Sequence, residues 1–454
     1  MIRERPPRNQ PRVPRSTWNR TPPVERSVFH VKLRRCGRPR PLSQNVRAQF
    51  AGVGVRQSRA FRPPMMSFAR YAELIGIPGL RATILASILG RLPVGVAGLS
   101  VLLLVQAASH SFGRAGAASA CYVAGLACMA PVVGRLIDRR GPRWPLLGSA
   151  VLYPSAMFGL LLAVRGSAPY WGVLALAAMA GASLPPVTVC MRSFLKRRLG
   201  EDPLLATAYS LESVLIETIF IVGPMLVALL VALASAALAV GFAAACGFAG
   251  ALLFARSPVL ARWRVEPRAH PSLFGPLAER RFLALLAVIA CYSIAFGLIE
   301  IGVTASAAEA GRRALAGVIP GLMSVGSVLG GLVYGSRTWR LPLRRQFAAG
   351  LFLMGLGAAL LALASQLLLF VVLSVVAGLV VAPVLAIQSM LVAKIASPHH
   401  ATEAFTWSAT GLLAGVGLGI AAGGWMLAHA HAPVVLAAAG SASLAASALA
   451  LILL

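Results

Sequence analysis

The sequence has few acidic residues, almost no lysine and little charge of any kind. Charged residues make up 12% of the 454 positions, with 13 acids and a formal net charge of +29. A soluble domain carries about 25% charged residues. Hydrophobic residues account for 58% of the chain, and its mean hydropathy is +0.79. This composition excludes an ordinary soluble protein and predicts a helical protein that crosses a membrane several times.

Motifs for nucleotide hydrolysis, metal binding and disulfide formation are also missing. No G-x-x-x-x-G-K-[ST] motif occurs, and the only lysines are Lys32, Lys196 and Lys394, which argues against an intrinsic ATPase. The cysteines form no C-x-x-C pair, and those in apolar segments are expected to be small buried hydrophobes. The histidines show no metal-ligand spacing. We therefore expect neither an enzyme nor a bound cofactor or metal.

Long apolar segments dominate the chain after residue 81. Twelve of them suit a bilayer-spanning helix of about 17–25 residues, and the longest are expected to tilt. They lie at approximately 82–108, 116–137, 145–164, 168–190, 204–231, 234–255, 282–304, 313–334, 346–364, 367–390, 402–428 and 432–453. The predicted fold class is an all-α membrane protein with twelve transmembrane helices.

Basic residues are concentrated in alternate loops between these segments. Lysine and arginine number 19 on one side of the membrane and 4 on the other, with Arg135 and Arg192 counted as loop residues of the basic side. The positive-inside rule places the basic side, together with both termini, in the cytoplasm. This distribution is a topology signal rather than a nucleic-acid-binding surface, so no nucleic acid is expected as a partner.

A short charged hairpin, Gly134–Trp144, joins the second and third segments. Gly141 and Pro142 are expected to form its turn, and its one acid, Asp138, can hold a neighbouring helix end or an arginine. The stretch resembles the signature loop of the major facilitator superfamily, G-x-L-x-D-R-x-G-R-K. The matching positions are Gly134, Leu136, Asp138, Arg139, Gly141 and Arg143. Pro142 replaces the basic residue that is usual in that family.

The resemblance implies two pseudo-repeated six-helix bundles around a central cavity, which alternate in access by rocking. The expected domains are a first bundle at 65–255, a cytoplasmic linker at 256–281 and a second bundle at 282–454. A conformational latch is expected to close the cytoplasmic side in the outward-open state. Its residues are Gly134, Asp138, Arg139, Gly141 and Arg143.

An internal repeat at an offset of 196 residues supports this division. Residues 134–137 (GRLI) are echoed by 330–333 (GGLV), and residues 207–210 (TAYS) by 403–406 (EAFT). One offset that serves two separate loops is expected of two parallel halves. Tyr334 stands where the repeat would place Asp138, so only the first half carries the charged loop.

The first 64 residues differ in composition from the rest of the chain. They contain 16 of the 42 basic residues, with only Glu4 and Glu25 as acids. Without apolar periodicity they are expected to be disordered, and without an apolar h-region they are not a signal peptide. They could form a cytoplasmic tail on anionic lipid, a nucleic-acid-binding arm, or an over-extended start of a chain that begins at Met65 or Met66. We favour the last, because transporter-like sequence begins at Ser67.

Charged residues inside the apolar segments are the candidate transport residues, because each costs at least about 2.5–3.5 kcal/mol on insertion scales. Arg91 lies near the middle of the first span, Glu212 and Glu217 on the fifth, and Glu300 near the outer end of the seventh. Glu212 and Glu217 point about 140° apart and cannot form a dyad. One of them is expected to carry a proton, since low dielectric favours a neutral carboxyl, with Arg91 competing for it or binding an anionic substrate. The alternative is a structural pair between Arg91 and one glutamate.

Further patterns concern helix packing. Gly223-Pro224 predicts a kink in the fifth span and partly resembles the antiporter motif of the superfamily, which favours export. Thr402 is expected to cap the eleventh span, with Glu403 at its positive end. The same span carries glycines at small-xxx-small spacing, expected at the interface of two rocking halves. They are Gly411, Gly415, Gly419 and Gly423.

These patterns favour a secondary transporter that exports a small, moderately apolar molecule by proton antiport. It is expected to be a monomer in the cytoplasmic (inner) membrane, with its substrate, protons and the lipid bilayer as partners. One alternative is an importer or uniporter of a sugar or organic acid, although few amides lie in the spans. The other is a non-transporting membrane receptor or scaffold whose basic tail binds lipid or nucleic acid.

Overall fold

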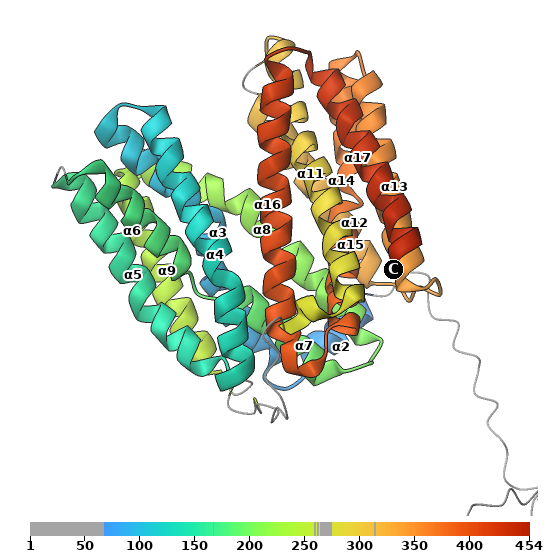
Figure 1. Cartoon of the computed structure of the whole chain (residues 1–454), viewed down its shortest axis with the longest axis horizontal. Coiled ribbons are helices and arrows are strands. Elements are labelled where there is room, and N and C mark those ends of the chain that lie inside the picture. The colour runs from blue at the N-terminus through green and yellow to red at the C-terminus, as the bar shows by residue number, and fades with distance from the viewer. Residues whose placement is uncertain (1–67, 167, 258–259, 261–262, 264–274, 313–314) are drawn as a thin grey trace, which may run out of the picture. The chain divides into compact units, whose positions relative to one another are not determined.

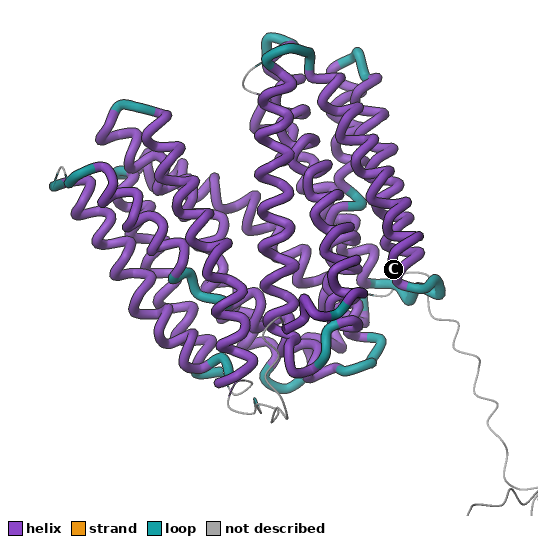
Figure 2. Tube along the Cα trace, in the orientation of Figure 1, coloured by secondary structure: helices purple, strands orange, loops and turns teal. Residues whose placement is uncertain are grey.

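A computed structural model describes residues 68–454, except for 167, 258–259, 261–262, 264–274 and 313–314. These residues belong to one compact unit, Pro63–Leu454. All of the regular structure in this described part is helical (Figure 2). The predicted tail at 1–64 lies outside it, as does most of the predicted linker at 256–281.

The first half of the fold, defined here as α3 to α9, is preceded by a short helix, α2. Their bounds are α2 (Ala69–Gly76), α3 (Leu80–Ser109), α4 (Phe112–Arg140), α5 (Arg143–Arg165), α6 (Tyr170–Ala182), α7 (Val187–Leu199), α8 (Leu204–Leu233) and α9 (Ala236–Ala255). These helices run from blue to green in Figure 1.

The second half, defined as α11 to α17, runs from yellow to red in Figure 1. Its elements are α11 (Arg280–Glu309), α12 (Leu315–Gly335), α13 (Leu343–Leu363), α14 (Leu367–Gly378), α15 (Val381–Ile395), α16 (Ala401–Leu427) and α17 (Ala432–Leu453). The short 3-10 turns η1 (Gly275–Ala278) and η2 (Pro398–His400) precede α11 and α16.

The prediction of twelve spans is confirmed, because 12 described helices are long and apolar enough to cross a membrane. Two of these spans consist of two helical segments each, α6 with α7 and α14 with α15. In the first, Pro185 and Pro186 follow the end of α6 and interrupt the backbone hydrogen bonding. The predicted end of this span at residue 190 was wrong, because α7 continues to Leu199. Arg192 therefore lies inside a span and not in a loop.

The hairpin between α4 and α5 is shorter than the sequence pattern suggested. Helix α4 continues to Arg140 and α5 begins at Arg143, which leaves Gly141 and Pro142 as the turn and puts Arg135 inside a span. Gly141 has φ 82°, in the region that favours glycine, and its N–H donates to the Ile137 carbonyl at 2.8 Å. The helices can therefore reverse direction within two residues.

Small residues allow close helix contacts within each half. A Cβ added at Gly250 of α9 would lie 2.1 Å from Gly90 Cα of α3, and one added at Gly378 would lie 2.0 Å from the Met323 carbonyl of α12. The glycines of α16 also pack inside their own half, since a Cβ at Gly419 would lie 2.2 Å from the Ile294 carbonyl of α11. Helix α16 does lie at the interface of the two halves, as predicted, since it contacts α4. Its glycines, however, face α11 of the same half, and another face of α16 approaches the first half.

Candidate functional site

The two halves contact each other at what we call the basic end. It is the end of the spans at which α4 turns into α5, α7 into α8, α12 into α13 and α15 into α16. In Figure 1, α7 and α2 lie at this end, where the two groups of helices meet. The two largest inter-half contacts are α4 against α16 and α8 against α12, and α8 also packs against α15.

The first contact is a helix cap supplied from the opposite half. Asp138, near the end of α4 and 5% exposed, accepts hydrogen bonds from the backbone N–H groups of Thr402 at 3.1 Å and Glu403 at 2.8 Å. These N–H groups belong to the first turn of α16, which has no intrahelical partners for them. A carboxylate there also faces the positive end of the helix dipole. The prediction that Thr402 caps α16 was wrong, because α16 begins at Ala401 and His400 holds the N-cap position, without a side-chain cap hydrogen bond.

Charged side chains next to this cap strengthen the same contact. Glu403, which is fully buried, accepts hydrogen bonds from Nε and Nη2 of Arg135 at 3.0 and 2.6 Å. His400 lies 3.5 Å from the other carboxylate oxygen of Glu403. Gly134 lets the helices approach, since a Cβ there would lie 2.5 Å from Thr406 Oγ1. Arg135 is thus a contact residue of the interface rather than a loop charge.

Arg139 and Arg143, the other predicted latch residues, do not take part in this contact. Both are exposed, and neither forms a hydrogen bond or ion pair with any described residue. The structure therefore brings together Gly134, Arg135 and Asp138 with α16, while Gly141 acts only in the turn.

The second contact, between α8 and α12, occupies the repeat-related positions and is neutral. Ser210 donates a hydrogen bond to the Gly331 carbonyl, and Thr207 donates to the Gly335 carbonyl at 2.8 Å. Tyr71 of α2 joins them by donating to the Leu332 carbonyl at 3.1 Å. Burial raises the pKa of Tyr71, so its hydroxyl stays a donor at physiological pH. Helix α2 was not predicted.

Arg91 and Glu212 form a buried ion pair inside the first half. Nη2 of Arg91 lies 2.6 Å from Oε2 of Glu212, and their side chains are 0% and 3% exposed. Nε and Nη1 of Arg91 have no hydrogen-bond partner among the described residues. Arg192 of α7 lies close enough to interact electrostatically with both members of the pair. Two cations and one anion therefore share this buried region. This cluster was not predicted from the sequence, because Arg192 was counted as a loop residue.

Glu217 is separate from this cluster, as its angular position on the helix predicts. It is 7% exposed and lies beside Ser324 and Ser327 of α12, in the second half. Ser327 also accepts a hydrogen bond from the Ala382 N–H at 3.0 Å. Among the described residues near Glu217, no arginine or lysine pairs with its carboxylate. An isolated carboxyl in a low dielectric favours its neutral form.

The remaining predicted residues lie elsewhere. Glu300 is exposed on α11 and its carboxylate contacts none of the other candidates in the described part of the chain. Gly223 is a close-approach position, since a Cβ there would lie 2.5 Å from the Gly95 carbonyl of α3. Pro224 follows it inside the uninterrupted helix α8. The absence of a side chain at Gly223 therefore allows α3 and α8 to pack closely at this position.

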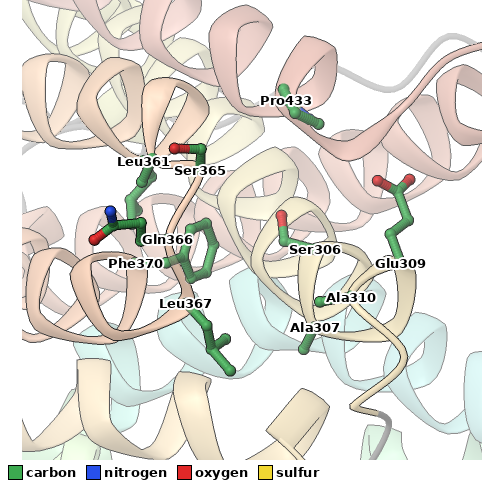
Figure 3. Close-up of a pocket in the computed structure, with 11 residues that line it drawn as sticks. Ser306, Ala307, Glu309, Ala310, Leu361, Ser365, Gln366, Leu367, Phe370 and Pro433 are labelled. Atoms are coloured by element: carbon green, nitrogen blue, oxygen red, sulfur yellow. The ribbon is translucent and has the colours of Figure 1, made fainter.

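A small cavity of about 170 Å³ lies at the opposite end of the second half (Figure 3). Ser306 and Glu309 of α11 line it, together with Gln366 and Phe370. Glu309 is the last residue of α11, and its carboxylate accepts a hydrogen bond from the Ala432 N–H at 3.0 Å. This carboxylate therefore caps α17 and has a structural explanation.

Comparison with known proteins identifies the family. The family model of the Major Facilitator Superfamily matches residues 83–311, half of the chain. The chain belongs to the Major Facilitator Superfamily. As a member of this superfamily it is a multi-pass membrane transporter and not an enzyme, and its fold supports secondary transport by alternating access.

Solved structures of the superfamily share this fold at low sequence identity. A bacterial homologue of the iron transporter ferroportin in the outward-facing state has a TM-score of 0.68 and 14% identity, over 83% of this chain and 98% of that chain. The fucose:proton symporter FucP of E. coli has a TM-score of 0.66 and 14% identity, over 83% and 99%. The human organic anion transporter MFSD10 (TETRAN) has a TM-score of 0.64 and 18% identity, over 83% and 98%. No curated protein matches the sequence significantly.

Proposed function

We propose that this superfamily member is a proton-coupled exporter of a small, moderately apolar molecule. The basic end faces the cytoplasm of a cell whose inner membrane holds the protein, and both termini lie on that side. The described conformation is then closed toward the cytoplasm. The 19-to-4 distribution of basic residues supports this orientation.

The observation that carries the proposal is the isolated carboxyl of Glu217 between the halves. It lies on α8 beside hydroxyl groups of α12 and has no basic partner among the residues described. When the halves separate, water reaches the carboxyl and favours its charged form. When they close, burial favours its neutral form. Protonation thereby shifts the population of the two states, which couples proton movement to alternating access.

Other candidate residues have supporting roles in this scheme. Gly134, Arg135 and Asp138 form the conformational latch with α16, and they release it when the cytoplasmic side opens. Arg91 and Glu212 form a buried pair that positions α3 against α8, and Arg192 supplies a second positive charge beside them. Glu300, at the opposite end of α11, can contact substrate as it leaves. The Gly223-Pro224 pair resembles the antiporter motif in part and supports export.

Import of a sugar or organic acid is the second candidate. It is favoured by one specific observation, the excess positive charge of Arg91 and Arg192 over Glu212, which suits an anionic substrate. The fucose:proton symporter shows that the same fold also supports symport of a sugar with a proton. Direction and substrate must therefore be tested together.

The test is proton flux in proteoliposomes that contain the full chain. Ethidium, lactate and fucose are added separately as a moderately apolar molecule, an organic acid and a sugar, and internal pH is followed with a trapped dye. We expect ethidium to trigger proton movement in the wild type and in Glu201→Gln, an exposed acid paired only with Lys196. Glu217→Gln is expected to abolish this movement while transport driven by the ethidium gradient persists. Unchanged coupling in Glu217→Gln removes Glu217 from the role, and a response to lactate or fucose alone replaces the exporter by the second candidate.

A further inference from the structure

A second described cavity lies at the basic end, outside the α4–α16 and α8–α12 contacts. Its volume is about 680 Å³, within the range of about 300–1,000 Å³ that ligand pockets occupy. The ends of α4 and α9 and the start of α5 surround it. Its main lining residues are Arg140, Arg143, Trp144, Leu147, Leu252 and Arg256. None of them belongs to the latch contact or to the buried ion pair.

The charged side chains that line the described part of this cavity are all positive. Arg140, Arg143 and Arg256 converge on it from three different helix ends, and none of its described lining residues is acidic. None of the three guanidinium groups forms a hydrogen bond or ion pair with another residue in the described ranges. Asp138 is near in sequence, but its carboxylate is engaged with α16. Three free guanidinium groups beside one cavity suit a phosphate group, which arginine binds through several donors at once.

The start of α5 adds donors to the same cavity. The backbone N–H groups of Arg143 and Trp144 precede the first intrahelical bond, which runs from the Leu146 N–H to the Pro142 carbonyl at 3.0 Å. They lie at the positive end of the helix dipole. The helix end thus reinforces the charge that the side chains already supply.

The apolar part of the cavity continues onto the membrane-facing surface. Leu147 and Leu252 line it, and Trp144 beside them is 71% exposed. One to two turns further into α5, Val151 and Leu152 are each 61% exposed and contact acyl chains in a bilayer. Tryptophan is typical of the level of the lipid headgroups. A ligand that fits both parts has a negatively charged head and long apolar chains.

We propose that this cavity binds an anionic phospholipid, with its phosphate on Arg140, Arg143 and Arg256 and its acyl chains along α5 and α9. Basic pockets between transmembrane helices are known binding places for anionic headgroups. Inorganic phosphate has the same charge chemistry but makes no use of the apolar wall. A zwitterionic lipid uses the apolar wall but brings an ammonium group toward three arginines.

The experiment counts bound lipids by native mass spectrometry of the full chain purified in detergent. The protein is titrated with dioleoyl phosphatidylglycerol, dioleoyl phosphatidylcholine or inorganic phosphate. The test variant combines Arg140→Gln, Arg143→Gln and Arg256→Gln. The control variant removes the same charge from exposed positions of the basic end outside the cavity, by Arg281→Gln, Arg340→Gln and Arg345→Gln. A second test variant, Leu147→Trp, fills the apolar part without changing charge.

We expect one phosphatidylglycerol to bind the wild type and the control variant at least tenfold more tightly than the triple test variant. We expect Leu147→Trp to lower phosphatidylglycerol binding as well. Equal loss in the test and control triples, or no loss in either, overturns the proposal. Equally tight binding of phosphatidylcholine also overturns the proposal, because the cavity would then not select an anionic headgroup. Displacement of the lipid by an equal concentration of inorganic phosphate, or unchanged lipid binding in Leu147→Trp, shows an anion site without a lipid and overturns it too.

Discussion

Replacing Asp138 by asparagine is expected to open the contact between α4 and α16. The carboxylate accepts two backbone hydrogen bonds, from Thr402 and Glu403, at 3.1 and 2.8 Å. An asparagine of the same shape keeps one acceptor oxygen but turns an NH₂ group toward the other backbone N–H. One of the two hydrogen bonds is lost, and the other is then made to a neutral oxygen instead of a carboxylate. One buried backbone N–H also faces the NH₂ group of the asparagine, which is another donor.

The size of the effect follows from these contacts. Hydrogen bonds to a charged group contribute about 1.5–3 kcal/mol each, and an unsatisfied buried donor costs about 1–3 kcal/mol. Because the side chain also keeps one acceptor, we expect a net loss of about 2–4 kcal/mol in the closed state. That corresponds to an increase of about 30- to 700-fold in the ratio of open to closed molecules at the basic end.

Hydrogen exchange of the backbone amides of 402 and 403, measured by mass spectrometry in detergent micelles, reports this opening directly. We expect the protection of these amides to fall by at least about 30-fold in Asp138→Asn. Glu201→Gln is the matched control, since it removes an acid at the same end whose side chain is 89% exposed. Unchanged protection in Asp138→Asn, or an equal fall in the control, would refute the interpretation of Asp138 as a cap that holds the two halves together.

Three other substitutions test the packing of the spans. Arg91→Gln should lower stability by about 3–5 kcal/mol because it removes the ion-pair partner of the buried Glu212, and adding Glu212→Gln should recover most of this loss. Equal thermal midpoints for the single and double variants would contradict this. Gly134→Ala should weaken the latch by about 1–3 kcal/mol, since its Cβ would lie 2.5 Å from a side chain of α16, and unaltered exchange of the α16 first turn would contradict this. Gly223→Ala should lower the thermal midpoint, whereas Gly241→Ala, with nothing within 4 Å of its Cβ, should not; equal effects would show that the close contact with α3 is unimportant.

The spans were predictable because each is a local property of the chain. A run of about 20 apolar residues has few alternatives to a transmembrane helix in a bilayer. Two errors arose because rules of this kind use only the local sequence. Helix α2 has only 8 residues, too few for the rule to detect. Arg192 was taken as a loop marker because the positive-inside rule counts arginines by sequence position and not by burial.

The contacts between the halves were only partly predictable, because they join residues far apart in the sequence. The hairpin pattern indicated that Asp138 holds either a helix end or an arginine, but Thr402 and Glu403 are 264 and 265 residues away. The glycine spacing of α16 indicated close packing without saying which neighbour it faces. The 196-residue repeat held the missing information, because Asp138 contacts α16 just as its counterpart region in α12 contacts α8.

The two repeat-related contacts use opposite ends of a helix, and this explains their different chemistry. At the N-terminus of α16 the free groups are N–H donors, so the residue that satisfies them is an acceptor, Asp138. Near the C-terminus of α12 the available backbone groups are carbonyl acceptors, so Thr207, Ser210 and Tyr71 contact them as donors. Hydroxyl groups exchange such carbonyls for water at little cost. A carboxylate that is 5% exposed cannot lose its donors without either keeping a buried, unsatisfied charge or entering water. The charged contact therefore favours two discrete states, joined or fully solvated, and this is the behaviour that alternating access requires of a gate.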